Sequence, residues 1–426
     1  MHVNYYCHYV RGSLLAFNNS RIANSKFAGQ GLNSWQWASS RMGVISKILY
    51  EFGKTKPLSQ TKLGLCLHIT KETSVLVMAA LQLGAKVTIC SANPLSVQDD
   101  IAAFLFTKGV SVFARRDETV KQYKDGIKAV LNTRPEVLVD DGSAMHVVAH
   151  SSGSEGIVGG TEETTSGIRR LKSLEKNGKL KYPVIGVNDA LSKHLFDNKY
   201  GTGQSTMDGI IRITNLLIAG KNIVVCGYGS VGKGIAIRAR GFGAIVTVTE
   251  TNAHRALEAH MDGFIVKRLI DAVSEGDIFI TCTGQIHVIR KEHISKMKSD
   301  SILANAGHFD TEIDTKYLES NCDDRYLVRR YIECFRIRGK KVYLLSSGRV
   351  VNLVGSEGNA PEVMAMSFAN QLLSLIYICR NHRNMKRAVH DVPIEIDEYV
   401  ALTSLKSLGI KIDKLTVVQM RYSDSY

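Results

Sequence analysis

Proline, paired cysteines and long apolar runs are scarce or missing in this sequence. The 426 residues include only 6 prolines and no low-complexity tract, which argues against long disordered linkers. No apolar run approaches the roughly 18 residues that a membrane-spanning helix needs, so we expect no membrane partner. The 8 cysteines are scattered and form no CxxC pair. This pattern indicates free thiols in a reducing cytoplasm and argues against a disulfide framework or a metal site.

Acidic residues are absent from the first 50 positions, which nevertheless contain several basic residues: Arg11, Arg21, Lys26, Arg41 and Lys47. Such a composition is typical of an organellar transit segment, and it also fits a divergent N-terminal extension. We favour an extension over residues 1–32, because Trp35–Leu49 already has the pattern of the first helix of the fold.

Basic residues outnumber acidic ones, and the formal net charge is +14. The densest basic stretches, Arg325–Lys341 and Arg380–Arg387, carry no nucleic-acid-binding motif. We therefore expect a solvated basic surface and no specific nucleic-acid partner. Nonspecific binding of polyanions at low salt is the alternative.

Short apolar runs alternate with helical patterns through most of the chain. Helical patterns include Lys71–Leu83, Val97–Thr107 and Gly355–Arg380. This order predicts an α/β fold with parallel sheets covered by helices on both faces. The predicted strands are Leu63–Leu67, Lys86–Cys90, Val110–Ala114, Val137–Val139, Pro183–Val187, Ile223–Val225, Ile245–Thr249, Asp277–Cys282, Ser301–Ala304 and Val342–Leu345.

A glycine motif follows one of these strands at once, as Gly227-x-Gly229-x-x-Gly232, and a helical pattern comes next. The first glycine permits a tight turn, the second lets the backbone approach a pyrophosphate, and the third lets the helix pack against the strand. Glu250 ends the next strand, where a carboxylate suits the two ribose hydroxyls of NAD better than the phosphate of NADP. A glycine-rich turn in another kind of α/β protein is the alternative.

Polar side chains follow several of the predicted strands. Ligands of open α/β sheets bind beyond the carboxyl ends of the strands, so these side chains predict a polar cleft. In the first half they are His68, Thr70, Ser91, Asn93, Asp140, Asp141, Asn188 and Asp189, and in the second half Gly227, Glu250, Thr283, Gly284 and Asn305–His308.

Several separated motifs in this order make the chain similar to the S-adenosyl-L-homocysteine hydrolase family, in its shorter archaeal and thermophile form. The resemblance runs from about Trp35 to the C-terminus. It rests on Cys66–Thr70 (CLHIT), Asn93–Asp99 (NPLSVQD), Asp140–Gly142 (DDG), Glu162–Gly167 (EETTSG), Phe196–Gly201 (FDNKYG), Gly227–Gly234 (GYGSVGKG), Gly307–Asp310 (GHFD) and Gly348–Leu353 (GRVVNL).

The resemblance implies two doubly wound parallel-sheet domains, a substrate domain and an inserted NAD-binding Rossmann domain. It places the first part of the substrate domain at 33–201, the NAD-binding domain at 202–351, a returning hinge helix at 352–385 and a C-terminal segment at 386–426. A homotetramer is also implied.

The family hydrolyses S-adenosylhomocysteine reversibly to adenosine and homocysteine. NAD⁺ takes hydride from C3′ of the ribose, and the resulting ketone acidifies the C4′ proton. Loss of that proton expels homocysteine, water adds, and NADH reduces the ketone again. The cofactor supplies the redox chemistry, and the protein supplies orientation and acid–base groups.

The resemblance also assigns roles to residues. Lys193 matches the base beside the 3′-hydroxyl, which requires that its pKa be lowered. Asp141 and His68 match the acid–base groups near C4′ and C5′. The implied catalytic set is His68, Asp141, Lys193, Asp197 and His308. The implied substrate-binding set is Thr70, Glu72, Asp141, Glu163, Lys193, Asp197 and Asn359. The implied NAD-binding set is Thr164, Thr165, Ser166, Asn198, Gly227, Gly229, Ser230, Val231, Gly232, Lys233, Gly234, Glu250, Thr283, Ala306, Gly307, His308 and Asn352.

The sequence departs from the family pattern at several points. The usual Asp-Asp-Gly-Gly-Asp is Asp140–Ala144 (DDGSA), which lacks one acid, and Ser230 replaces a common aspartate. Asn359 replaces the family's histidine, which touches the purine and gates the cleft. The sequence therefore leaves two properties open, namely the gating of the cleft and whether the site prefers adenine or hypoxanthine. The C-terminus lacks the long members' Lys-Pro-x-x-x-Tyr arm, which predicts weaker retention of NAD.

Three alternatives therefore stand beside S-adenosylhomocysteine hydrolysis. The first alternative is a hydrolase of S-inosylhomocysteine. The second is an NAD-dependent dehydrogenase of a 2-hydroxy acid, and the third is a catalytically silent NAD-binding regulator. A dehydrogenase of that class needs an Arg and a Glu–His pair at the nicotinamide, which Lys193-x-x-x-Asp197-Asn198 fits poorly. A silent regulator is free to lose His68, Asp141 and Lys193, all of which are retained.

Overall fold

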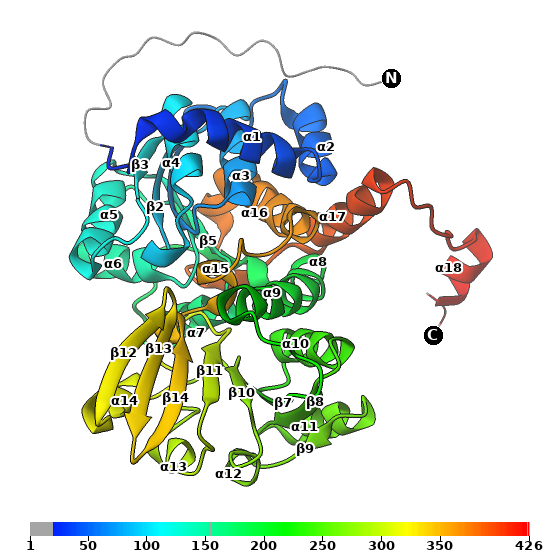
Figure 1. Ribbon diagram of the computed structural model, residues 1–426. Helices are drawn as coiled ribbons and strands as arrows, with labels where there is room; N and C mark the ends of the chain where they lie inside the picture. The colour runs from blue at the N-terminus through cyan, green and yellow to red at the C-terminus, as the bar shows by residue number, and fades with distance from the viewer. Residues whose placement is uncertain (1–19, 154, 424, 426) are drawn as a thin grey trace.

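The computed structural model describes residues 20–153, 155–423 and 425. These residues form two helix-covered sheets, which occupy the upper and lower parts of Figure 1. The prediction of an α/β fold with two parallel-dominated sheets is therefore confirmed.

The first sheet has seven strands in the order β15-β6-β5-β4-β1-β2-β3, and every neighbouring pair is parallel. Its central strands are buried along nearly their whole length, as expected for a sheet covered on both faces. The strands are β1 (Lys62–Leu67), β2 (Lys86–Ser91), β3 (Ser111–Phe113), β4 (Val137–Asp140), β5 (Gly159–Glu162), β6 (Val184–Gly186) and β15 (Val389–Asp391).

The second sheet has eight strands in the order β12-β13-β14-β11-β10-β7-β8-β9. The six strands from β14 to β9 are parallel, and β12, β13 and β14 form an antiparallel edge. The strands are β7 (Asn222–Cys226), β8 (Ile245–Thr249), β9 (Ile265–Val266), β10 (Ile278–Thr281), β11 (Ser301–Asn305), β12 (Asp324–Arg329), β13 (Ile332–Ile337) and β14 (Lys340–Leu345).

Helices connect the strands and cover both sheets. The first sheet carries α1 (Ala28–Ser39), α2 (Gly43–Phe52), α3 (Lys71–Gln82), α4 (Asp99–Thr107), α5 (Val120–Asn132), α6 (Ala144–Ser152), α7 (Thr165–Lys176), α8 (Leu191–His194), α16 (Pro361–Asn381) and α17 (Ile394–Ser407). The second sheet carries α10 (Ser230–Gly241), α11 (Ala253–Met261), α12 (Leu269–Ala272), α13 (Lys291–Ile294) and α14 (Thr315–Asn321).

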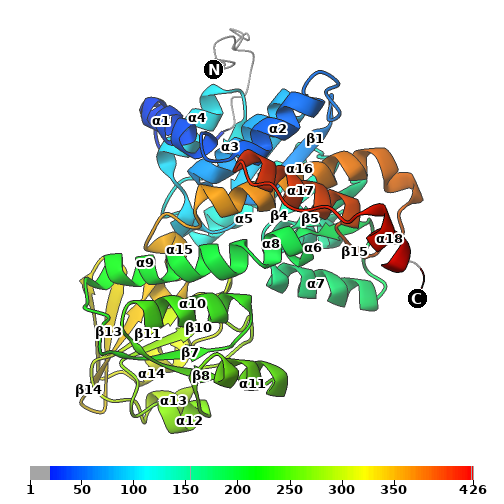
Figure 2. The ribbon, with the colours of Figure 1, turned by 90° about the vertical axis from the view of Figure 1, so that its right-hand side faces the viewer.

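Two segments carry the chain from one sheet to the other and back. The outward segment is α9 (Thr202–Thr214), which runs across the junction in Figure 2, and the return passes through α15 (Val351–Val354) into α16. Side chains of α16 then join the apolar core of the first sheet. The cleft between the sheets is therefore bounded by chain segments that are distant in sequence.

α16 is also the one helix among the described residues with the length and hydropathy of a membrane span. Within Pro361–Asn384, 67% of the 18-residue apolar stretch is buried inside the protein. Core helices of water-soluble proteins have the same property. The expectation of no membrane partner stays a prediction.

The start of the fold differs from the predicted helix at Trp35–Leu49. The structure has two helices there, α1 and α2, because Met42 adopts a non-helical backbone (φ −103°, ψ 53°) and buries its side chain completely. Upstream, Arg21 exchanges backbone hydrogen bonds with the β3 region, through Val112 and Ala114. The predicted extension therefore includes residues that pack on the first sheet, while residues 1–19, with Cys7 and Arg11, lie outside the described residues. The exact domain boundaries stay a prediction.

The far end of the chain forms an arm. α18 (Val417–Ser423) stands apart from both sheets in Figure 1, and all its residues are exposed. β15, which falls within the predicted C-terminal segment, instead adds a parallel edge strand beside β6.

Candidate functional site

A cavity of about 900 Å³ lies between the two sheets, and residues from both of them line it. The predicted site residues that line it are His68, Thr70, Glu72, Asp141, Glu163, Thr164, Thr165, Ser166, Lys193, Asp197, Asn198, Gly227, Gly229, Ser230, Val231, Glu250, Thr283, Ala306, Gly307, His308, Asn352 and Asn359. Residues that follow strands of both sheets line the cavity, as expected, but five of the strand-end residues do not, namely Ser91, Asn93, Asp140, Asp189 and Asn305. The individual roles given to the predicted site residues stay predictions.

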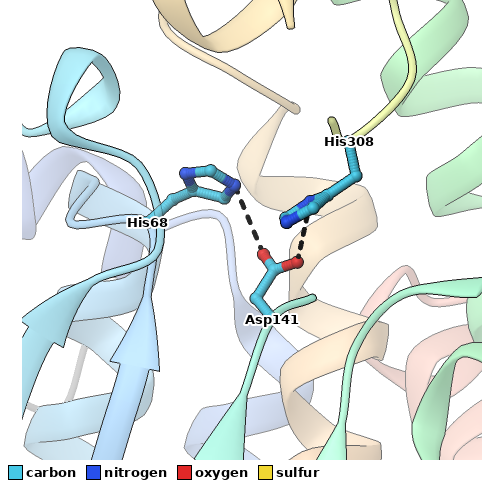
Figure 3. Close-up of side chains that lie close together, drawn as sticks. All are labelled: His68, Asp141 and His308. Carbon is cyan, nitrogen blue, oxygen red and sulfur yellow. Dashed lines mark ion pairs between the residues drawn. The ribbon is translucent and has the colours of Figure 1, made fainter. Parts of the chain in front are cut away.

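Two histidines converge on Asp141, which directly follows β4 (Figure 3). His68, just beyond β1, places Nε2 at 3.4 Å from Asp141 Oδ2. His308, from the loop after β11 in the other sheet, places Nδ1 at 3.5 Å from Asp141 Oδ1. Nδ1 of His68 lies 2.6 Å from Ser96 Oγ, which orients the ring. The contact between Asp141 and His308 therefore spans the cleft.

Burial sets the protonation of this group. It lowers the pKa of both His68 and His308 to about 4, although the charge of Asp141 partly opposes the shift at His308. Burial also raises the pKa of Asp141, against the charges of His308 and Lys193. Both imidazoles are therefore neutral at pH 7, where each can donate one hydrogen bond and accept another.

Lys193 occupies the centre of a second cluster, on α8. Its Nζ lies 2.9 Å from Asp197 Oδ2 and 3.7 Å from Glu163 Oε1. It also donates to Asn198 Oδ1 at 2.8 Å and to Asn188 Oδ1 at 3.4 Å. The ammonium is buried and surrounded by acceptors.

The pKa expected for Lys193 is wrong in direction. Burial alone would lower it, but the charges of Asp197 and Glu163 outweigh burial, so the pKa is raised above its ordinary value. The role implied by the resemblance required a lowered pKa, whereas the folded chain supplies two carboxylates within 4 Å of Nζ. Lys193 therefore carries its proton at neutral pH.

Glu163 is the carboxylate best suited to exchange a proton in this cluster. Burial raises its pKa to about 7, against the opposing charge of Lys193. Ser367 and Gln371 of α16 both donate to its oxygens, which fixes the side chain. Neither residue was predicted, because each reads in the sequence as part of a buried helix face.

Asn359 belongs to a polar network around Asp197 and Asn352. Its Nδ2 donates to Asp197 Oδ1 and, at 3.1 Å, to Thr202 Oγ1. Its Oδ1 accepts from Ser205 Oγ at 2.7 Å and from Asn352 Nδ2 at 3.3 Å. Asn359 therefore lines the cavity and also holds Asp197 in place.

The glycine-rich turn after β7 fits a dinucleotide. Gly227 has φ +108°, which favours glycine. A Cβ on Gly229 would meet only Arg255 Nη1, at 3.7 Å, so room for a phosphate is left beside the start of α10. A Cβ on Gly232 would lie 2.0 Å from the Gly227 carbonyl oxygen, so the third glycine is needed for packing.

Glu250 closes this turn. Its carboxylate accepts backbone N–H bonds from Tyr228, Thr251 and Asn252, at 2.6 to 3.0 Å. Burial would raise its pKa, but these donors outweigh it and the pKa is lowered, so the carboxylate is ionised at neutral pH. A fixed anion here suits ribose hydroxyls and repels a ribose phosphate.

Three members of the predicted NAD-binding set do not line the cavity. Gly232 and Gly234 serve packing, since a Cβ on Gly234 would lie 1.9 Å from the Lys199 carbonyl oxygen. Lys233 turns outward and pairs with Glu258 of α11. The geometry gives these three residues no direct contact with the cavity.

Other residues line the cavity although they were not predicted as site residues. They are Arg169, Asn188, His194, Thr202, Arg255, Leu353, Met364 and Phe368, among others. Asn188 follows β6, so its place at a strand end was the signal that marked it. Met364 and Phe368 are spaced as one face of α16, a pattern that sequence reasoning assigns to a core.

Among the described residues, two groups of His, Asp and Glu side chains have possible metal-ligand atoms within 4.8 Å of one another, namely His68–Asp141–His308 and Asp140–His146–Glu162. In the second group both nitrogens of His146 already face Tyr182 and Thr161. Glu162 accepts from Gly142 N, Ser143 Oγ and Thr164 N. Through these hydrogen bonds the second group fixes the loops beside the cavity. The expectation that the protein binds no metal stays a prediction.

Comparison with known proteins agrees with this geometry. The family models described as "S-adenosyl-L-homocysteine hydrolase" and "S-adenosyl-L-homocysteine hydrolase, NAD binding domain" match residues 19–156 and 198–358.

Relatives match over nearly the whole chain. An S-inosyl-L-homocysteine hydrolase of Methanocaldococcus jannaschii is 48% identical over 93% of this chain and 96% of its own. An adenosylhomocysteinase of Sulfolobus acidocaldarius is 48% identical over 94% and 97%, and one of Aquifex aeolicus is 46% identical over 95% and 98%. A solved structure of dipicolinate synthase from Bacillus halodurans covers 75% of this chain and 98% of its own at 13% identity, with a TM-score of 0.44 that carries no argument about function. The chain belongs to the S-adenosyl-L-homocysteine hydrolase family.

Proposed function

We propose that this protein hydrolyses S-adenosyl-L-homocysteine reversibly to adenosine and L-homocysteine, with NAD held in the same cavity. One observation carries the proposal. The Lys193 cluster, the Asp141–His308 pair and the dinucleotide turn all line a single cavity between the two sheets. A hydrolase that oxidises its substrate needs these three parts within reach of one ribose.

The cavity offers a different environment to each part of the substrate. Leu353, Met364 and Phe368 provide apolar surface beside Thr70 and Glu72, which suits a flat purine with a polar edge. Glu163, Lys193 and Asp197 provide acceptors and a donor for ribose hydroxyls. The purine would therefore lie against α3 and α16, and the ribose against α8.

The proton of the 3′-hydroxyl passes to Lys193 only after Lys193 has lost its own. Glu163 is placed to take that proton, because Oε1 lies 3.7 Å from Nζ and its pKa is about 7. The two residues thus act together as the base. The glycine turn, Asn198, Thr164 and His308 line the part of the cavity that would hold NAD, and NAD would supply reversible hydride transfer at C3′.

Asp141 serves the C4′ and C5′ side of the ribose. Its carboxylate accepts the C4′ proton, and the neutral His68 and His308 hold it from either side. His68 Nε2, 3.4 Å from Asp141 Oδ2, can take this proton from Asp141 and pass it to the leaving sulfur. Addition of water runs the relay in reverse, and the imidazole is neutral before and after each transfer.

Contacts between the two sheets keep water from the oxidised sugar. Arg170 of α7 donates to the Gly142 carbonyl oxygen at 3.1 Å, and its guanidinium lies 3.8 Å from the centroid of the Phe309 ring. Phe309 comes from the loop after β11 and Gly142 from the loop after β4. Movement about the α9 and α15 crossings would open this contact and admit substrate.

S-Inosyl-L-homocysteine is the second candidate substrate. Two observations favour it, namely the relative from M. jannaschii with that printed activity and the presence of Asn359 at the purine end. Asn359 is committed to Asp197 and Ser205, so it discriminates between purines less directly than a free amide would.

Two further properties complete the proposal. A homotetramer is inferred from the resemblance, and the exposed apolar residues of the C-terminal arm, such as Leu415, Val418 and Tyr422, would be covered in it. A cytoplasmic location is inferred from the seven described cysteines, which are all free thiols.

The test is release of free thiol from S-adenosyl-L-homocysteine by the purified protein, with and without NAD⁺, with S-inosyl-L-homocysteine run in parallel. Equal amounts of thiol and adenosine support the proposal. Thiol from the inosine compound alone supports the second candidate. Bound NAD without thiol from either compound contradicts both.

A further inference from the structure

Glu72 offers an acceptor to the purine end of the cavity. Its side chain is 2% exposed, and no hydrogen bond to Oε1 is found among the described residues. Glu72 lines the cavity from the first turn of α3. The contact to Oε1 is a 3.3 Å ion pair with Lys71 Nζ, and a carboxylate oxygen has two lone pairs, so it can also accept from a bound ligand.

Lys71 stands beside this carboxylate, outside the set of described residues that line the cavity. Its Nζ lies 3.3 Å from Glu72 Oε1 and donates to Glu357 Oε2 at 2.7 Å. The Lys71 side chain is only 12% exposed, so solvent screens these charges incompletely. One ammonium therefore serves two carboxylates, one buried and one at the surface.

Glu357 ties this pair to the returning segment of the chain. Its other oxygen lies 3.6 Å from Arg212 Nη1 of α9. Gly358 and the cavity residue Asn359 follow directly. The chain of contacts from Glu72 to Arg212 thus joins α3, the loop before α16 and α9 at the purine end of the cavity.

Adenine and hypoxanthine differ at the edge that such a carboxylate reads. Adenine presents a donor at N6 and an acceptor at N1, whereas hypoxanthine presents an acceptor at O6 and a donor at N1. An ionised carboxylate only accepts, but a protonated carboxyl both donates and accepts. The protonated form therefore matches N1 and N6 of adenine together, and the ionised form beside a cation matches N1–H and O6 of hypoxanthine.

We propose that Lys71 determines the purine preference of this site by keeping Glu72 ionised and by placing positive charge near the six-position of the base. The inference rests on the proposed function, because it assumes that the cavity holds a purine nucleoside. Lys71 does not touch the substrate and acts through Glu72, so it is a positioning residue. Relative to a site without this ammonium, Lys71 raises the affinity for hypoxanthine against that for adenine.

The electrostatics agree with the geometry. Burial raises the pKa of Glu72, and the Lys71 charge opposes that rise. Burial would lower the pKa of Lys71, but Glu72 and Glu357 outweigh it, so Lys71 stays charged. Without the ammonium, only the hydrogen bonds from the helix backbone and Thr70 oppose the burial of Glu72, so the neutral carboxyl gains.

The test compares Lys71→Met with Lys71→Arg and with the exposed Lys86→Met as matched control. Equilibrium dialysis with NAD⁺ present gives the Kd of adenosine and of inosine, and thiol release gives kcat/KM for the two thioethers. We expect Lys71→Met to shift the preference toward adenine by about tenfold, as expected when one charge-assisted hydrogen bond changes partner. Lys71→Arg and Lys86→Met should keep the wild-type ratio.

Glu357→Gln tests the loop contact separately from the Lys71 charge, because it removes the carboxylate charge that holds Lys71 to the loop and leaves the ammonium in place. We expect it to weaken both nucleosides alike, without changing their ratio. The proposal would be overturned if Lys71→Met, in protein of unchanged Tm, kept the adenine-to-hypoxanthine preference within about twofold of wild type. It would also be overturned if Glu357→Gln shifted that preference as much as Lys71→Met does. If wild type binds both nucleosides but releases no thiol, the proposed hydrolysis fails while the binding ratio still tests Lys71.

Discussion

Asp141 and His308 belong to different sheets, yet His308 Nδ1 lies 3.5 Å from Asp141 Oδ1. Between them sits Gly142, where a Cβ would lie 2.1 Å from His308 Nε2. Because residue 142 has no side chain, His308 can approach Asp141. The contact between these two residues in turn joins the two sides of the cleft.

Gly142→Ala should disrupt this arrangement. The new methyl group displaces the His308 ring, and φ +97° strains any residue other than glycine. We expect thiol release to fall by about a hundredfold or more, equivalent to about 2.7 kcal/mol. Gly178→Ala is the control, since Gly178 has φ +64° with nothing within 4 Å. Equal losses in the two variants would show that backbone strain, and not the His308 contact, is responsible.

Lys193→Ala should abolish oxidation of the ribose. Adenosine added to the NAD-containing protein should no longer raise the absorbance at 340 nm, a loss of about a thousandfold in rate for one acid–base group. The half-buried Lys199, whose Nζ lies 5.4 Å from the Tyr200 ring, provides a lysine control six residues along the chain. Near-normal turnover of a folded Lys193→Ala protein would remove the assigned role.

The rate of oxidation should depend on the protonation of Glu163. Its pKa of about 7 means that kcat/KM rises with pH through that value, because only the ionised form accepts the proton of Lys193. His68 and His308 have pKa values of about 4, so they should add no limb between about pH 5 and 8. Glu163→Gln should lose the limb near pH 7 and most of the activity. A limb that persists in Glu163→Gln would assign it to another group.

The pH dependence of stability should also reveal the titration of Glu163, but stability should fall with rising pH where the rate rises. The folded-state pKa of Glu163 is raised from 4.5 to about 7, so its contribution to the free energy of unfolding is fully present below pH 4.5. It is lost as the pH rises through 7, because only the folded state holds the proton in that range. The Tm difference between wild type and Glu163→Gln, measured from pH 4.5 to 8, should therefore change in this window. A constant difference would mean that Glu163 does not titrate there.

Asn359→His should change two properties at once. The imidazole cannot reproduce all four contacts of the amide, with Asp197, Thr202, Ser205 and Asn352. We expect oxidation to slow by about tenfold, the effect of one lost hydrogen bond to a charged group, and the ratio of kcat/KM for the adenine and hypoxanthine substrates to move. An unchanged ratio with slower oxidation would limit Asn359 to positioning Asp197.

Elements marked by local pattern were predictable from the sequence. β8 has the predicted bounds Ile245–Thr249, because an apolar β-branched run ends there at Glu250. Strand β5, Gly159–Glu162, was missed because two glycines and a glutamate give no strand signal, although β4 and β6 enclose it. The antiparallel β12 was missed because its six residues are exposed and partly charged.

Properties that depend on distant residues were not predictable. The raised pKa of Lys193 comes first from Asp197, four positions along the chain, and then from Glu163, which the fold brings within 3.7 Å, so only the second contribution depends on a distant residue. Lys71 and Glu357 are 286 positions apart and still form a hydrogen bond. α16 begins later than the predicted helix at Gly355, because Gly358 has φ +83° and Pro361 occupies the first turn.

The most direct test of the account is exchange at C4′ of adenosine in D₂O, measured by mass spectrometry and NMR on the recovered nucleoside. If the ribose is oxidised at C3′ and Asp141 removes the C4′ proton, the protein with NAD⁺ should place one stable deuterium at C4′. Lys193→Ala should place none. Thiol release by the wild-type protein without any deuterium at C4′ would contradict the oxidation route on which the account rests.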